Sequence, residues 1–168
     1  NNTISMLDAD SLAVVFEVGV GQDPRSVAID DSGNAWVACY DDDQIDIVSP
    51  AGSVVDTIDL DYGDGPIGIV ISQDGTYAWV SMMNAGVVRR FSTATRVNAG
   101  NVNAGPTPRA LALSADGGTL YVSRFLSPVS HGEVRQIDTG SLTVTNTIIL
   151  YKFGWDAHRD GTAEGMGV

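Results

Sequence analysis

Short runs in which apolar residues occupy every second position follow one another along most of the chain. In residues 26–30 (SVAID) the apolar side chains are Val27 and Ile29, and later runs repeat this alternation. A period of two is that of a β-strand with one buried face. Long stretches with apolar residues three and four positions apart are nearly absent from the sequence. The pattern therefore predicts an all-β fold.

The predicted strands recur with a period of 42 residues. The segments PRSVAIDDSGN, PIGIVISQDGT and PRALALSADGG begin at positions 24, 66 and 108, and each ends in an Asp- and Gly-rich turn. After these turns come AWVACY, AWVSMM and LYVSRF. A repeat of this length, kept in register over three copies, indicates a repeat architecture.

Each copy contains four predicted strands, A to D. Strand A covers residues 26–30, 67–72 and 109–114, and strand B carries the large aromatic residues Trp36, Trp79 and Tyr121. Strand C covers 45–48, 87–91 and 134–137, and strand D covers 54–60, 96–102 and 142–150. Four antiparallel strands in each repeat of about 40–45 residues are typical of β-propeller blades.

The predicted architecture is a single partial β-propeller domain with about 3.5 blades. Residues 1–20 supply strands C and D of one blade, residues 21–62, 63–104 and 105–150 form three blades, and residues 151–168 form a long loop entering the next. A closed ring is expected to hold 7 or 8 blades. Because a part ring leaves two apolar blade faces open, we expect further blades of the same protein, or self-assembly, to close it.

Two sequence signatures resemble the YVTN family of β-propeller repeats found in surface-layer and periplasmic proteins. The family's Tyr-Val-Thr-Asn stretch falls on WVAC, WVSM and YVSR, which begin at Trp36, Trp79 and Tyr121. A glycine also stands three residues before each strand A proline, in the segments GQDP, GDGP and GPTP. The resemblance covers residues 4–150. It implies a propeller in an extracytoplasmic protein, whether periplasmic, secreted or on the cell surface, and it implies little about chemistry.

The charge of the chain argues against nucleic-acid binding. The formal net charge is −12, and the 15 acidic residues within positions 1–86 are opposed there by a single arginine. Nucleic-acid binding needs clustered Lys and Arg, which this half lacks and the other half supplies only weakly. No apolar run approaches 18 residues, so no membrane span is predicted. The acidic surface is instead expected to confer solubility, with a cation or a basic partner as the alternative.

The cysteine and the clustered aspartates are two further candidates for a site. The single cysteine, Cys39, lies in an apolar run and is expected to be a buried, inert thiol that forms no internal disulfide. Acidic residues of the first full blade and its flanking loops favour solvated turns over a Ca²⁺ site, because three consecutive aspartates cannot all face one ion. These residues are Asp23, Asp41, Asp42, Asp43, Asp61 and Asp64.

Strand order places the B–C and D–A loops around the mouth of the propeller channel, where propeller sites usually lie. The third blade has long loops there, at residues 125–132 and 151–160, and both histidines fall in them. Arg25 and Arg109 share one repeat position at the start of strand A and are expected near the channel. Packing of the loops on one another, ligand binding and catalysis all stay open for this rim. The candidate ligand-binding residues are Arg25, Arg109, Arg124, His131, Trp155, Asp156, His158 and Arg159.

Three functions fit these patterns. The preferred one is a non-catalytic extracytoplasmic scaffold that binds a protein or ligand through its loop-rich rim, with no metal or cofactor, since the sequence shows no catalytic motif. The alternative is the propeller portion of a periplasmic redox enzyme linked to a c-type cytochrome domain outside this chain. Residues 160–168 resemble the segment that, in some larger YVTN-type proteins, leads into another blade and then such a domain. A third is a lyase similar to the streptogramin-inactivating propellers, which use a rim histidine and a metal.

Overall fold

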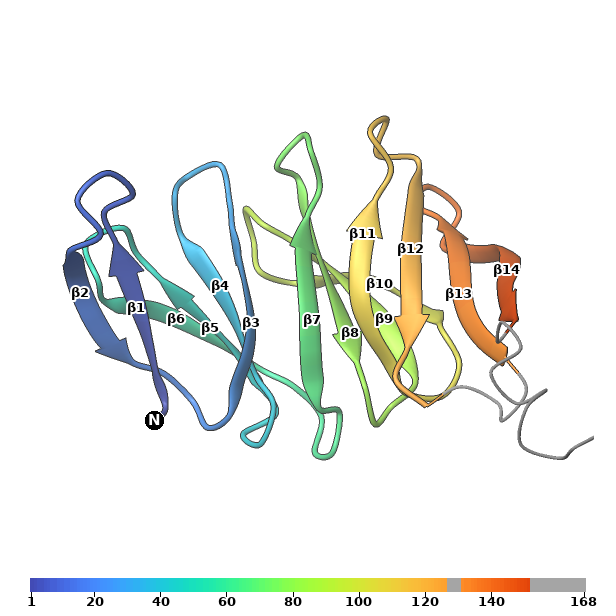
Figure 1. Ribbon diagram of the computed structural model, residues 1–168, viewed down its shortest axis with the longest axis horizontal. Coiled ribbons are helices and arrows are strands. Elements are labelled where there is room, and N and C mark those ends of the chain that lie inside the picture. Colours follow the sequence, from blue (N-terminus) through green and yellow to red (C-terminus); the bar gives the residue numbers. More distant parts are fainter. Residues whose placement is uncertain (127–130, 152–168) are drawn as a thin grey trace, which may run out of the picture.

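The computed structural model describes residues 1–126 and 131–151, and within these ranges the chain forms only strands and their connections (Figure 1). No helix in the described ranges is long and apolar enough to cross a membrane. The strands are β1 (Thr3–Leu7), β2 (Val14–Gly19), β3 (Pro24–Ile29), β4 (Ala35–Cys39), β5 (Gln44–Val48), β6 (Val54–Asp59), β7 (Pro66–Ile71), β8 (Tyr77–Met82), β9 (Val87–Ser92), β10 (Asn98–Asn103), β11 (Pro108–Leu113), β12 (Thr119–Arg124), β13 (His131–Asp138) and β14 (Thr143–Tyr151).

Strands that follow one another along the chain pair antiparallel. Within the described residues, β1 pairs with β2, and the later strands form three four-stranded sheets, β3 to β6, β7 to β10 and β11 to β14, each in chain order. We call these sheets the first, second and third blades. The prediction of an all-β propeller with about 3.5 blades is confirmed.

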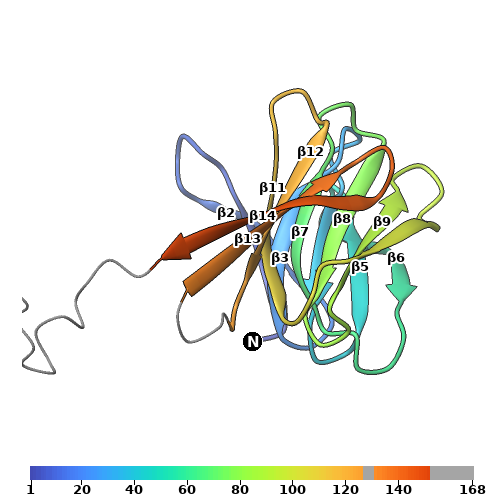
Figure 2. The same cartoon turned by 90° about the vertical axis from the view of Figure 1, so that its right-hand side faces the viewer.

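The blades stand side by side, and their first strands lie closest to one another (Figures 1 and 2). β3 packs against β7, and β7 packs against β11. The sequence pattern predicted that these strands begin one or two residues after the proline. Each begins at the proline itself, because the proline still pairs with strand B. Pro24 pairs with Cys39, and a bulge follows in this blade and at the same point in the other two.

Apolar side chains from facing blades fill the space between the sheets. Trp36 and Ile47 of the first blade pack with Ile69 and Val80 of the second, and a separate cluster around Trp79 joins the second blade to the third. Trp36 is fully buried and Trp79 is 2% exposed. The large aromatic residue of strand B therefore belongs to the core in the first and second blades, whereas Tyr121 of the third blade is partly buried.

The A–B turns repeat in all three blades and lie at one end of the sheets, at the top of Figure 1. Gly33, Gly75 and Gly117 have φ values of +81°, +69° and +71°. Residues with a Cβ adopt this region reluctantly, which explains why the turn keeps its glycine. The B–C and D–A loops lie at the opposite end, which we call the mouth end.

Cys39 lies at the end of β4, packed with β1–β2 side chains, and it is fully buried. Burial, together with the nearby Asp46 carboxylate, raises the pKa of its thiol to about 12. The thiol is therefore protonated at neutral pH and poorly nucleophilic. The expectation of a buried, inert cysteine is confirmed.

The stack ends in an uncovered apolar face on β3. Val27 and Ile29 are 53% and 59% exposed, whereas Ile69, which stands at the Val27 position of the second blade, is 8% exposed because the first blade covers it. Val144, Ile149 and Leu150 are exposed on β14 at the other end. The described blades thus form part of a propeller with two open faces, as expected.

Candidate functional site

A pocket of about 190 Å³ opens at the mouth end, where the inner strands of all three blades begin. Each blade contributes the residue after its strand A proline and the residue that follows strand B. The six lining residues are Arg25, Tyr40, Ile67, Met83, Arg109 and Phe125. The repeat therefore builds the pocket, with an arginine–aromatic pair in the first and third blades and an apolar pair between them.

Arg25 stacks on Tyr40 and pairs with a local carboxylate. Its guanidinium carbon lies 5.5 Å from the centroid of the Tyr40 ring, and its Nε donates to Asp23 Oδ2 at 2.7 Å. Asp23 lies in the D–A loop and has a φ of +53°. Arg25 therefore lies at the mouth, but much of its charge is neutralised.

Arg109 differs from Arg25 in its partners. Its guanidinium carbon lies 4.5 Å from the centroid of the Phe125 ring. In the described ranges its side chain has no ion pair or hydrogen bond, and the residue is exposed. A guanidinium stacked on a ring keeps its N–H edge available to a ligand. Arg109 is thus the arginine of this pocket whose charge is open to a partner.

Two other predicted rim residues meet at a carboxylate that the sequence pattern did not single out. Arg124 Nη1 forms an ion pair with Glu133 Oε2, and His131 Nε2 lies 3.1 Å from Glu133 Oε1. Arg124 Nε also donates to the Pro106 carbonyl oxygen at 3.1 Å. The hydrogen bond from Arg124 is the main cause that holds the pKa of Glu133 below its ordinary value. Glu133 lies two positions after His131 in one strand, and this spacing was the available signal.

The remaining candidates lie outside the described residues. Trp155, Asp156, His158 and Arg159 all follow position 151, so nothing in the structure places them near the mouth pocket. Their part in ligand binding stays a prediction from the sequence.

The aspartates of the mouth loops hold the loops in place. Asp43 accepts backbone N–H bonds from Gly63 at 2.7 Å and Gly65 at 2.8 Å, which ties the B–C loop to the next D–A loop. Arg89 forms an ion pair with Asp64 at 2.8 Å, and burial is the main cause that raises the pKa of Asp64. Within the described part of the chain, no three His, Cys, Asp or Glu side chains gather as a metal site.

Comparison with known proteins places this architecture among the propellers. Neither a family model nor a curated protein matches the chain. Hydrazine synthase from Kuenenia stuttgartiensis superposes with a TM-score of 0.82 at 24% identity, over 89% of this chain and 44% of that one. The fold is a β-propeller.

Two further solved structures agree. Virginiamycin B lyase from Staphylococcus aureus gives a TM-score of 0.72 at 14% identity, over 88% of this chain and 48% of that one. A streptogramin B lyase gives 0.73 at 18%, over 89% and 48%. The chain spans about half the length of these structures. Such identities show the fold alone, so the YVTN resemblance stays a prediction.

Proposed function

We propose that this chain belongs to a non-catalytic, extracytoplasmic propeller scaffold that binds a protein or small ligand through its mouth end. The observation that carries the proposal is the mouth pocket, where Arg25 and Arg109 converge beside the apolar pair of the second blade. The group that suits this pocket is an anion on an apolar body, such as a carboxylate side chain of a protein partner.

The open charge of Arg109 supports an anionic ligand. A guanidinium held by stacking on Phe125 loses little freedom when it binds, and its fork of N–H groups matches a carboxylate in two parallel hydrogen bonds. Ile67 and Met83 offer apolar surface beside it. Pockets of this kind, mostly apolar with a few directed polar groups, are typical of ligand sites.

The lining residues favour binding over catalysis. Arginine stays protonated at any physiological pH, and isoleucine, methionine and phenylalanine carry no proton to transfer. The Tyr40 hydroxyl donates a hydrogen bond to Asn84 Oδ1 at 3.1 Å, so its proton is already engaged. None of these six side chains is suited to act as a general acid or base near neutral pH.

The test is binding of an acidic probe, the tripeptide tri-glutamate, measured by isothermal titration calorimetry. Arg109→Gln removes the open charge and is expected to weaken binding about tenfold, the loss of one charge-assisted hydrogen bond. Arg25→Gln is expected to have a smaller effect, because Asp23 already neutralises Arg25. Added salt is expected to weaken binding to the unaltered protein.

The control is Arg96→Gln, which removes the same charge from the opposite end of the blades. Arg96 pairs there with Asp56 at 2.6 Å. Equal affinities for Arg109→Gln and Arg96→Gln would refute the mouth site, as would an absence of tri-glutamate binding to the unaltered protein.

The second candidate is the propeller portion of a periplasmic redox enzyme with a c-type cytochrome domain outside this chain. Its support is the similarity to hydrazine synthase, of which the chain covers 44%. In that case the natural polypeptide is expected to be longer and to show a haem absorbance band. The lyase hypothesis is supported by the similarity to the virginiamycin B and streptogramin B lyases; of the rim histidines it could use, His131 lies beside Glu133, and His158 lies outside the described residues.

The extracytoplasmic location rests on the resemblance to YVTN repeats. Fractionation of the source cells tests it. Recovery of the protein with the cytoplasmic fraction would contradict both the scaffold and the periplasmic redox proposals in their present form.

A further inference from the structure

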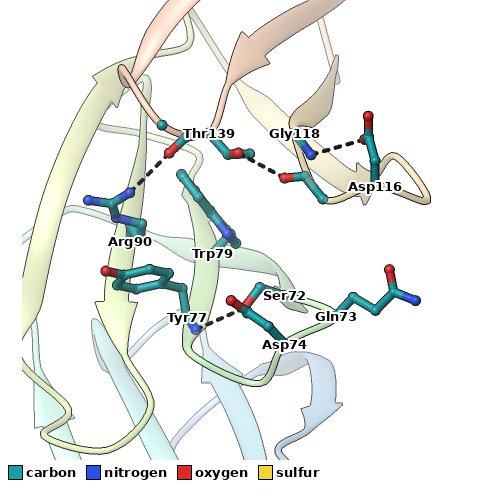
Figure 3. Close-up of a pocket in the computed structure, with 11 residues that line it drawn as sticks. Ser72, Gln73, Asp74, Tyr77, Trp79, Arg90, Asp116, Gly118 and Thr139 are labelled. Atoms are coloured by element: carbon teal, nitrogen blue, oxygen red, sulfur yellow. Dashed lines mark hydrogen bonds between the residues drawn. The ribbon is translucent and has the colours of Figure 1, made fainter.

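A second and larger pocket lies at the opposite end of the blades, between the second and third. Its volume is about 550 Å³, within the range of small-molecule sites. The A–B turns of both blades and the C–D turn of the third frame it, so none of its residues belongs to the mouth (Figure 3). The residues used below are Ser72, Asp74, Tyr77, Trp79, Arg90 and Asp116.

The wall of this pocket holds a hydrogen-bond donor without an acceptor. Trp79 is 2% exposed, and its indole N–H meets no acceptor in residues 1–126 and 131–151. In the first blade the equivalent Trp36 donates to Asp30 Oδ2 at 3.0 Å. The second blade has Ser72 in place of Asp30, so the acceptor is missing. In the described ranges Trp79 Nε1 is not among the side-chain atoms that are both enclosed and unpaired, so its N–H faces the solvent of the pocket, and a bound ligand that accepts from it replaces water there.

Ser72 does not replace the missing acceptor, because its hydroxyl is held by Asp74 and the Tyr77 backbone and forms no hydrogen bond with Trp79. It donates to Asp74 Oδ1 at 2.6 Å and accepts from the Tyr77 backbone N–H at 2.9 Å. A ligand in the pocket can therefore supply an acceptor for Trp79 that the described residues do not.

Arg90 closes the inner wall and is not available to bind an anion. Its guanidinium carbon lies 4.4 Å from the centroid of the Tyr77 ring, and its Nη atoms donate to the carbonyl oxygens of Thr139 and Ala99 at 3.0 Å each. The equivalent residue of the first blade is Ile47, which packs fully buried beside Trp36. Arg90 thus fixes the two blades to each other through its Nη donors, while its Nε is enclosed and has no hydrogen-bond partner among the described residues.

The rim of the pocket carries two ionised carboxylates with one free oxygen each. Asp116 Oδ1 accepts from the Ser114 hydroxyl at 2.5 Å and the Gly118 N–H at 3.0 Å, and Asp74 Oδ1 is held in the same way by its own turn. These bonds hold the pKa of both carboxyls below the ordinary value. Among the described residues neither Oδ2 atom receives a hydrogen bond. The rim therefore offers acceptors, and the wall offers a donor.

We propose that this pocket between the second and third blades binds a neutral saccharide. A hydroxyl group both donates and accepts, so a polyhydroxylated ring can accept from Trp79 while it donates to Asp74 and Asp116. An anionic ligand is disfavoured by the two carboxylates. A cationic side chain suits the rim but supplies no acceptor for the indole N–H.

The test follows the Trp79 indole N–H signal by NMR in the full polypeptide. The probes are neutral trisaccharides of glucose, galactose, mannose or N-acetylglucosamine, with tri-lysine as the cationic alternative. At least one trisaccharide is expected to shift the Trp79 signal, assigned with Trp79→Phe, and to do so equally in 0.5 M NaCl because a neutral ligand is not screened. The Trp36 signal is expected to stay in place, since Asp30 occupies that donor.

Asp116→Asn is the sharpest variant, because asparagine keeps the Oδ1 acceptor for the turn and removes the free carboxylate oxygen. It is expected to weaken binding about tenfold. Ser72→Asp restores the acceptor of the first blade and is expected to abolish binding. The matched control is Asp8→Asn, since Asp8 Oδ1 holds Ser11 in the same kind of turn outside the pocket.

Three results would overturn the proposal. The first is that no trisaccharide shifts the Trp79 signal. The second is that only tri-lysine shifts it and salt removes the effect, which would identify a basic protein partner instead. The third is that Asp116→Asn and Ser72→Asp bind a trisaccharide as well as Asp8→Asn does. The mouth site is tested by a different probe and different variants, so failure of one proposal leaves the other intact.

Discussion

Replacing Asp30 with alanine is expected to destabilise the first blade more than any exposed substitution. Its carboxylate accepts from the Ser32 and Asn34 backbone N–H groups at 2.9 Å each, and from Asn34 Nδ2 at 3.1 Å. It also accepts from Trp36 Nε1 at 3.0 Å. Water can replace the turn contacts at the surface, but it cannot reach the indole of a fully buried tryptophan.

The loss has two parts of different size. Leaving the Trp36 N–H unpaired in the core costs about 2 kcal/mol, and the loss of the more accessible turn bonds adds about 1 kcal/mol. We therefore expect Asp30→Ala to lower the free energy of unfolding by about 3 kcal/mol. Urea unfolding followed by circular dichroism measures this value. Asp31→Ala, which removes the same charge from the next, exposed position, is expected to change it by less than about 0.5 kcal/mol.

The pH dependence gives an independent check. Burial raises the pKa of Asp30, but the bonds from Trp36 and Asn34 outweigh it, so the folded-state pKa lies below the ordinary value. A carboxyl with a depressed pKa adds stability that is present above the unfolded-state pKa, near 4, and is lost as the pH falls through the folded one. Asp30→Ala should therefore lose less stability than the unaltered protein between about pH 4 and pH 2. Equal losses, or a destabilisation no larger than that of Asp31→Ala, would refute the assigned role.

Two other predictions concern buried residues, and the first uses the repeat as an internal control. Ile69→Ser is expected to destabilise the protein by about 2–4 kcal/mol in urea unfolding, since it empties a packed core site. Val27→Ser, at the same repeat position, should change stability by less than about 0.5 kcal/mol because Val27 is exposed. Similar values for the two variants would contradict the conclusion that the first blade covers Ile69 and that nothing described covers Val27. The Cys39 thiol is expected to react with a thiol-specific reagent at pH 8 only in denaturant, and rapid labelling of the folded protein would contradict its burial and raised pKa.

Repetition made the blades predictable, because each strand is specified three times by alternating residues and by the same proline and turn. The mouth pocket was partly predictable for the same reason, since Arg25 and Arg109 occupy one repeat position. Sequence reasoning did not find that Tyr40 and Phe125 stack on them, because each contact joins two residues that are far apart along the chain.

Differences between the copies were the signal that sequence reasoning left unused. Ser72 stands where the first blade has Asp30, and Arg90 stands where it has Ile47. Either change is unremarkable when read alone along the chain. They matter because Trp36 and Trp79 occupy the same place in neighbouring blades, and the contacts within each blade show that one indole has an acceptor and the other has none among the described residues.

The uncovered face of β3 shows what kind of element the partial ring needs. Val37, which pairs with Val27, is 1% exposed because β1 and β2 cover it, whereas Val27 itself is 53% exposed. β1 and β2 therefore cover the outer part of the blade and leave the inner strand bare. Burying one such side chain stabilises a protein by about 1.5–3 kcal/mol. The A and B strands of the blade that contains β1 and β2 would gain this stabilisation by packing on Val27 and Ile29. A partner that docks elsewhere on the rim would leave Val27 and Ile29 in water, which favours blade strands, from the same protein or a second copy, as the element that closes this end.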